Sequence, residues 1–221
     1  ISREHLSRIE SGKISLTLEM KEKLLTALEK FNPDEPLFLL FDYVRIRFPT
    51  MDIKHIIKDV LRLNIQYMLH EDWAYFSYTE QYYIGDVFVY TSADEEKGVL
   101  LELKGKGCRQ MECYLLAQER SWYDFMLDCM TAGGVMKRLD LAINDKAGIL
   151  NIPELIEKCK HDECVSVFRH FRFYASGEIS HQRERNHKEM GTTMYIGSMK
   201  SEVYFCIYEK NYEQYIKAGV P

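Results

Sequence analysis

The sequence has no apolar stretch long enough to form a membrane-spanning helix. Its uninterrupted apolar runs, such as residues 37–41, are only about five or six residues long, whereas a span needs about 18 or more such residues. Proline and glycine are also sparse, with five and twelve copies among 221 residues, so little material is available for a long flexible linker. We therefore expect a globular chain without a membrane span, organised as one large domain or two small ones.

An excess of positive charge is likewise absent. Lysine and arginine total 29, aspartate and glutamate total 34, and the formal net charge is −5. Bulk charge would not hold this chain on nucleic acid, so DNA binding would need a local basic surface or a metal ion. The best basic stretch is 169–188, which contains Arg183 and Arg185. It could follow a phosphate backbone near a reactive site, or it could be a solvated hairpin whose glutamates dilute its charge.

Several compact metal-binding and nucleotide-binding motifs are missing as well. The six cysteines show no C-x-x-C spacing and the seven histidines no H-x-H triplet. We expect reduced, mostly buried thiols in a cytoplasmic protein, in preference to disulfides or a zinc site. The glycine-containing segment 104–107 lacks the serine or threonine of a nucleotide-binding loop, so no ATP binding is expected.

Residues 1–31 differ from the rest of the chain, and we expect them to form a short helical block. Within it, SREHLSRIESGK resembles the recognition helix and following turn of Cro/repressor-type helix-turn-helix proteins. That resemblance implies DNA recognition in the major groove by Ser2, Arg3, Glu4 and Ser7. The alternative is a helical hairpin docked on the larger domain.

A turn-rich linker, 32–41, leads into a strand-rich body, 42–221. Its hydrophobic periodicity predicts helices that alternate with antiparallel hairpins. The expected helices include 52–63 and 111–130, and the expected strands include 73–78, 82–90, 98–104, 135–144 and 202–210. We therefore expect an α+β fold: an open, mainly antiparallel sheet of ferredoxin-like repeats with helices on one face, preceded by a partial helix-turn-helix.

Three of the expected strands alternate between an apolar face and a polar face. Their polar faces carry Glu102, Asp140 and Tyr208. If the strands belong to one sheet, these three side chains rise from a common surface. Two carboxylates can bind a hard divalent cation through oxygen, and a tyrosine beside the cation could act as a nucleophile on phosphate. The alternative is a mixed polar face that serves solubility alone.

Exposed aromatic side chains could add a surface for unpaired bases. The candidates are Trp73, Tyr75, Tyr82 and Tyr83. Core packing is the favoured interpretation of these residues, because aromatic side chains bury large areas in protein interiors.

The run TTMYIGSMKSEVYFCIYEK, 192–210, resembles the tyrosine segment of the rolling-circle replication initiators of staphylococcal plasmids. The positions that fit the family pattern are Tyr195, Gly197, Ser201, Ile207, Tyr208 and Lys210. The resemblance implies that Tyr208 is the nucleophile. It also implies that Glu102, and Asp140 within RLDLA, bind Mg²⁺ or Mn²⁺.

Together with a helix-turn-helix, this pattern resembles the relaxases of Gram-positive integrative conjugative elements. The resemblance implies a metal-dependent enzyme that nicks one strand at an origin of transfer and forms a covalent 5′-phosphotyrosine. Phosphate stabilisation would fall to Arg138, Lys210 or Lys104. The family pattern continues beyond the tyrosine, so we expect 42–221 to be a catalytic domain that is incomplete at its C-terminal end.

The expected partners are duplex origin DNA and single-stranded DNA at the nick. A helicase or coupling protein and a second copy of the chain are further candidates. Two alternatives stay open: a plasmid rolling-circle replication initiator with the same chemistry, and a non-catalytic DNA-binding regulator.

Overall fold

The computed structural model describes residues 37–178 and 188–212, and these fall into two compact units. The first unit ends at Asn144 and the second begins at Asp145. The expected helix-turn-helix, with Ser2, Arg3, Glu4 and Ser7, lies outside the described residues. So do Arg183 and Arg185.

The first unit is built on a six-stranded sheet with the order β2-β3-β4-β5-β1-β6. The strand pairs β2–β3, β3–β4, β4–β5 and β5–β1 are antiparallel. The strands are β1 (Leu37–Phe48), β2 (Leu69–Glu71), β3 (Glu80–Ile84), β4 (Val87–Thr91), β5 (Val99–Lys104) and β6 (Val135–Asp145). Residues 37–41, assigned above to the linker, therefore lie in a strand.

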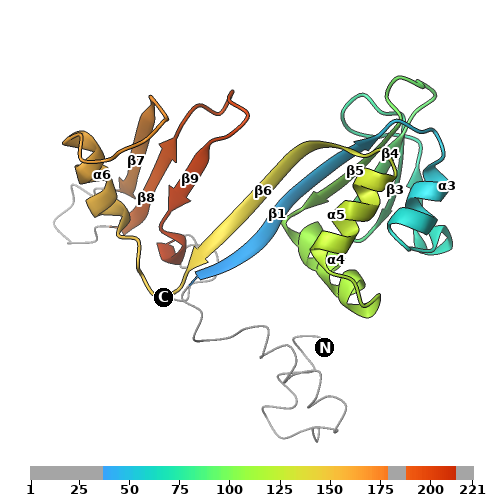
Figure 1. The fold of residues 1–221 in the computed structure, drawn as a ribbon, viewed down its shortest axis with the longest axis horizontal. Coiled ribbons are helices and arrows are strands. Elements are labelled where there is room, and N and C mark those ends of the chain that lie inside the picture. The colour runs from blue at the N-terminus through green and yellow to red at the C-terminus, as the bar shows by residue number, and fades with distance from the viewer. Residues whose placement is uncertain (1–36, 179–187, 213–221) are drawn as a thin grey trace, which may run out of the picture. The chain divides into compact units, whose positions relative to one another are not determined.

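Helices cover one face of this sheet. They are α3 (Ile53–His55), the π-helix η1 (Ile56–Val60), α4 (Gly105–Ala117) and α5 (Trp122–Thr131), and a short 3-10 helix η2 (Ile65–Tyr67) follows η1. Alternation on β1 and β5 places Val44, Ile46, Leu101 and Leu103 in one core with Phe125 of α5. Figure 1 shows α4 and α5 lying against the sheet. The expected α+β fold with helices on one face is confirmed.

The single helix expected over 111–130 is instead two helices. Ser121 is the N-cap of α5 and forms a capping box with Asp124, in which each side chain accepts a hydrogen bond from the other residue's backbone N–H. Glu119 has a φ of 53°, which α-helical backbone does not tolerate. The chain therefore turns at 118–121, and α5 is a separate helix from α4. The glycine-containing segment 104–107, expected as a loop, supplies the first turn of α4.

The expected strand over 73–78 is a loop, and its aromatic residues are not core residues. Phe76 and Ser77 have φ values of 57° and 61°, which a strand cannot contain. Trp73 and Tyr75 are 52% and 53% exposed. The core interpretation was therefore wrong for these two. Tyr82 does pack against the main core.

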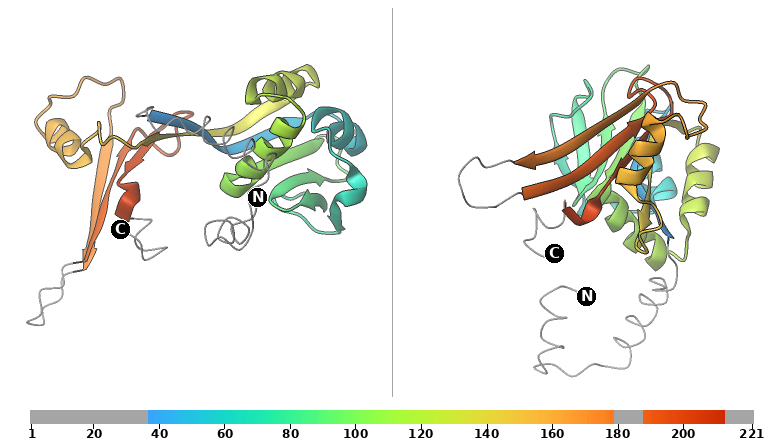
Figure 2. Two further views of the ribbon diagram at one scale, coloured as in Figure 1. Left: turned by 90° about the horizontal axis from the view of Figure 1, so that it is seen from below. Right: turned by 90° about the vertical axis from the view of Figure 1, so that its left-hand side faces the viewer.

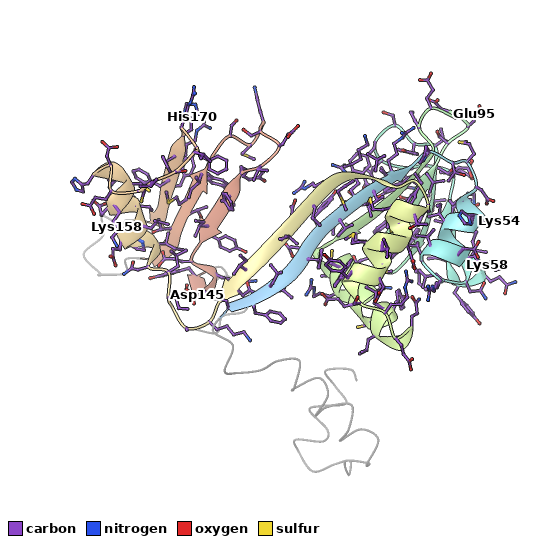
Figure 3. All side chains as sticks on the ribbon, in the orientation of Figure 1. Lys54, Lys58, Glu95, Asp145, Lys158 and His170 are labelled. Carbon is purple, nitrogen blue, oxygen red and sulfur yellow. The ribbon has the colours of Figure 1, made fainter. Side chains whose placement is uncertain are left out.

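The second unit contains one helix and a three-stranded sheet. The helix is α6 (Ile152–Lys160), and the sheet has the order β7-β8-β9, with β7 (Phe171–Glu178), β8 (Lys188–Ile196) and β9 (Phe205–Tyr208). Ile152 and Ile156 of α6 pack against Met194 of β8, so α6 covers one face of this sheet (Figure 2, left). Lys158 projects from α6, and His170 lies just before β7 (Figure 3).

Within the described residues, no helix is long and apolar enough to cross a membrane. All six cysteines have free thiols. Burial of most of them was expected, but only Cys108 and Cys129 are buried, and Cys113 and Cys206 are exposed.

Candidate functional site

Glu102 lies on the face of β5 that points away from the helices, and its side chain has no exposed surface. Three groups bind its carboxylate. Tyr43 donates a hydrogen bond to Oε1, Tyr90 donates one of 2.7 Å to Oε2, and the ammonium of Lys104 lies 3.3 Å from Oε2. An unpaired buried carboxylate would be very costly, so these partners explain how the charge is tolerated. The sequence-based expectation of a solvent-facing acid was wrong for Glu102.

The environment of Glu102 also changes the acidity of the two phenols that bind it. Burial, followed by the hydrogen bond to Glu102, raises the pKa of Tyr43 to about 12. The same causes raise the pKa of Tyr90 well above its ordinary value. Both phenols therefore stay protonated at neutral pH and serve as hydrogen-bond donors. Neither is suited to act as a nucleophile.

Asp140 lies on β6, on the other side of β1, and is bound by Arg138. The guanidinium of Arg138 donates hydrogen bonds of 2.9 Å to Oδ1 and 2.6 Å to Oδ2. The same guanidinium carbon lies 4.1 Å from the ring centre of Tyr43. A continuous set of contacts therefore runs from Asp140 through Arg138 and Tyr43 to Glu102, across β6, β1 and β5.

The two acids suit a divalent metal in chemistry, but each is already engaged. Carboxylate oxygens are the ligands that Mg²⁺ and Mn²⁺ prefer. Asp140 would have to release Arg138, and Glu102 would have to release Tyr43. The donor set fits a metal whose binding displaces these partners.

A second group of possible metal ligands, which was not predicted from the sequence, lies on β2 and β3 and in the residue that follows β2. Ligand atoms of His70, Asp72 and Glu80 lie within 4.8 Å of one another. His70 Nε2 is 3.0 Å from Glu80 Oε2 and 3.8 Å from Asp72 Oδ1. The H-x-D spacing of 70–72 was the available signal. Only the fold reveals Glu80, because it depends on the β2–β3 pairing.

The expected single sheet carrying Glu102, Asp140 and Tyr208 is not what the structure has. Glu102 and Asp140 share the six-stranded sheet, whereas Tyr208 lies on β9 of the three-stranded sheet. The expected burial of one apolar face also fails for β6. Its apolar row is exposed and consists of Leu139, Leu141 and Ile143.

Tyr208 lies on the face of its sheet opposite α6. Its Cα pairs with Thr193 of β8, and Cys206 pairs with Tyr195. The preceding residue, Ile207, points to the other face of the sheet and packs against the core that α6 forms with Met194. This alternation leaves the Tyr208 ring partly exposed on the open face. Lys210 follows β9 and is exposed.

An open pocket of about 410 Å³ lies on the same face. Its lining comprises Arg172, Tyr174, Thr193, Tyr195, Gly197 and Met199. On the β7 side of β8, Arg172 pairs with Tyr195, and Tyr174 pairs with Thr193. On the β9 side, Thr193 pairs with Tyr208. The pocket therefore lies next to Tyr208. Arg172 is exposed and is the one charged residue in the lining of this pocket. Sequence reasoning noted the basic stretch but did not single out Arg172.

Gly197 allows the chain to turn where the pocket meets the end of β8. Its φ is +90°, and a Cβ there would lie 2.9 Å from the ring of Phe168. Both the backbone conformation and the close approach require glycine. This accounts physically for the glycine in the tyrosine-segment pattern.

Comparisons with known proteins match both units. Residues 38–128 match the "Rolling Circle replication initiation protein N-terminal domain", and residues 134–221 match the "Replication initiation factor" family. Both units therefore match families of replication initiation proteins. The expected family is thereby confirmed.

Two individual proteins are similar to this chain. The Bacillus subtilis (strain 168) protein described as "Putative DNA relaxase NicK" is 42% identical over 189 residues, which are 85% of this chain and 52% of the relative. The chain thus spans about half the length of that curated relative. The solved rolling circle replication initiator protein of Geobacillus stearothermophilus matches with a TM-score of 0.66 at 23% identity, over 84% of this chain and 70% of that one. This second likeness concerns the fold.

Proposed function

We propose that this chain is part of a relaxase that nicks one strand of DNA at a specific site. Tyr208 is the nucleophile. Its hydroxyl oxygen attacks a backbone phosphorus, a bond from phosphorus to the tyrosine oxygen forms, and the bond to the 3′-oxygen breaks. The phenol gives up a proton and the departing 3′-oxygen gains one. The products are a 5′-phosphotyrosine and a free 3′-hydroxyl, and the ester keeps the strand available for rejoining.

The observation that carries this proposal is the placement of Tyr208 on the open face of the β7–β9 sheet, beside the Arg172 pocket. A DNA strand needs access to the attacking oxygen, and the face that α6 leaves open provides it. Arg172 can contact a backbone phosphate there. Lys210, two residues after Tyr208, is a second candidate for neutralising the phosphate.

Glu102 and Asp140 are proposed to hold Mg²⁺ or Mn²⁺. When bound, such an ion neutralises charge on a phosphate and lowers the barrier to its displacement. Arg138 has two roles in this account. It balances Asp140 in the metal-free protein, and once released it can stabilise phosphate.

Recognition of duplex DNA is assigned to the N-terminal segment through Ser2, Arg3, Glu4 and Ser7. Arg183 and Arg185 are assigned to the DNA backbone. The proposed partners are origin duplex DNA and the single strand released at the nick. A helicase or coupling protein and a second protomer are also proposed.

The test is incubation of the full-length protein with Mn²⁺ and a supercoiled plasmid that carries the DNA flanking its gene. The expected products are nicked circles with covalently attached protein. Shifted but intact circles would instead indicate a non-catalytic DNA-binding regulator and would contradict the proposal.

A plasmid replication initiator is the second candidate, because both family matches carry replication-initiation descriptions. The chemistry would be the same. A plasmid whose copying depends on the full-length gene would favour initiation, whereas transfer of the DNA to a recipient cell would favour the relaxase.

A further inference from the structure

The loop between β2 and β3 carries three exposed aromatic rings. Trp73, Tyr75 and Phe76 are 52%, 53% and 46% exposed. The Trp73 and Tyr75 rings meet edge to face with centres 5.4 Å apart. Single exposed aromatic residues are ordinary on protein surfaces, but three in one short loop form a patch that points to a binding role.

The loop is held in an unusual conformation. Phe76 and Ser77 both have positive φ values, 57° and 61°, a backbone conformation that non-glycine residues adopt only at an energetic cost. Contacts at its C-terminal end hold it. Tyr78 is buried against Tyr90 and Leu100, and its hydroxyl donates a 3.0 Å hydrogen bond to the carbonyl of Lys97. The protein therefore fixes the loop while leaving three of its rings exposed.

Two cations from the sheet lie against two of these rings. The Arg45 guanidinium carbon is 4.5 Å from the ring centre of Phe76, and the Lys104 ammonium is 5.5 Å from that of Tyr75. Nε of Arg45 is buried and has no hydrogen-bond partner among the described residues. Aromatic rings edged by cations suit a ligand that combines flat π-systems with negative charge. A single-stranded nucleic acid has both.

We propose that the loop 72–78 is a base-stacking site for single-stranded DNA. Unpaired bases stack on Trp73 and Tyr75, and the backbone phosphates lie toward Arg45 and Lys104. This inference rests on the proposed function for the source of the strand, but the site lies wholly within the first unit. Its binding can therefore be measured without the nicking reaction.

The chain's two tryptophans make the test direct. Trp122 is half-buried and stacks on Phe41 at 4.5 Å, so Trp122→Phe keeps an aromatic ring there and leaves Trp73 as the one tryptophan of this chain. The test uses a short oligothymidylate and the full-length protein carrying Tyr208→Phe and Trp122→Phe, measured with and without Trp73→Phe, so that the difference between the two signals is the fluorescence of Trp73. Quenching of Trp73 that saturates with the oligonucleotide supports the proposal, and absence of quenching overturns it.

Affinity measurements give the second readout. Stacking contributes about 1–3 kcal/mol per base, a factor of about 5 to 150 in affinity, so Trp73→Ala and Tyr75→Ala should each weaken oligonucleotide binding within that range. Tyr67→Ala is the matched control, because Tyr67 is 74% exposed on η2. Trp73→Phe should bind almost as the parent does, which separates lost stacking from misfolding.

The outcomes separate this proposal from the nicking proposal. If the Trp73→Ala, Tyr75→Ala double variant bound the oligonucleotide with unchanged affinity, the proposed stacking site would be wrong. The exposed rings would then be assigned to binding a protein partner. Trp73 quenching in a protein whose Tyr208-bearing form does not nick would support the site while contradicting the proposed function.

Discussion

Tyr90 donates a 2.7 Å hydrogen bond to Oε2 of Glu102, a carboxylate that has no contact with solvent. Hydrogen bonds to charged groups contribute about 1.5–3 kcal/mol. Removing the Tyr90 hydroxyl leaves part of a buried charge without its partner. We therefore expect Tyr90→Phe to lower the free energy of unfolding by about that amount in urea titrations. Tyr123→Phe, at an exposed ring of α5, is the control, and equal stabilities of the two variants would contradict the account.

The hydrogen bond from Tyr43 to Glu102 should make the free energy of unfolding depend on pH. Its folded pKa is raised from 10.0 to about 12, so the folded state holds this proton more tightly than the unfolded chain does. The resulting stability is complete below pH 10 and is lost as the pH rises from about 10 to 12. Between pH 9 and 11.5, Tyr43→Phe should therefore lose less stability than the wild type in urea titrations. If the free energies of unfolding of the two proteins fell in parallel as the pH rises, Tyr43 would not be buried against Glu102.

The metal assignment can be mapped with Fe²⁺ in place of Mg²⁺. Ascorbate and peroxide then generate radicals at the bound ion, and these cut the nearby backbone. Cuts around 102 and 140 that disappear in Asp140→Ala are expected. Cuts confined to 70–80 that disappear in His70→Ala would move the site to the His70, Asp72 and Glu80 group.

Asp140→Ala should also weaken DNA cleavage in a way that added Mn²⁺ partly restores, because Glu102 remains as a ligand. Arg138→Ala frees Asp140 from its ion pair, so the metal concentration needed for half-maximal activity should fall. Nicking that persists undiminished in chelator would remove the metal from the mechanism.

Arg172 tests the pocket beside Tyr208. Arg172→Ala removes the pocket's positive charge, and cleavage of a single-stranded substrate should fall about fivefold or more, with partial recovery in Arg172→Lys. Arg169→Ala changes an exposed arginine outside the pocket lining and serves as the control. Equal losses in Arg169→Ala and Arg172→Ala would indicate a general charge effect and no specific pocket.

Sequence periodicity was sufficient for the fold class and for the face on which a residue lies. The alternation of Val99, Leu101 and Leu103 placed these residues in the core and Glu102 on the opposite face, as the structure has it. It could not reveal that Glu102 is buried, because Tyr43 and Tyr90 bury it from other strands. The helix break at 118–121 was encoded locally in the Ser121–Asp124 capping box.

Other features depend on pairing, which alternation does not specify. β9 alternates as a strand of the main sheet would, yet its hydrogen-bonded neighbour is β8. The exposure of Trp73 and Tyr75 depends on two positive φ values in the loop. Residue type alone gave no sign of either.

The proposed nicking reaction depends on a covalent bond between Tyr208 and DNA. The most direct measurement is mass spectrometry of the peptide that carries DNA after cleavage of a labelled substrate by the full-length protein. The account predicts a phosphodeoxynucleotide on Tyr208, with no adduct in Tyr208→Phe and unchanged adduct in Tyr204→Phe. An adduct on Tyr195, Tyr204 or any residue of the first unit would contradict it.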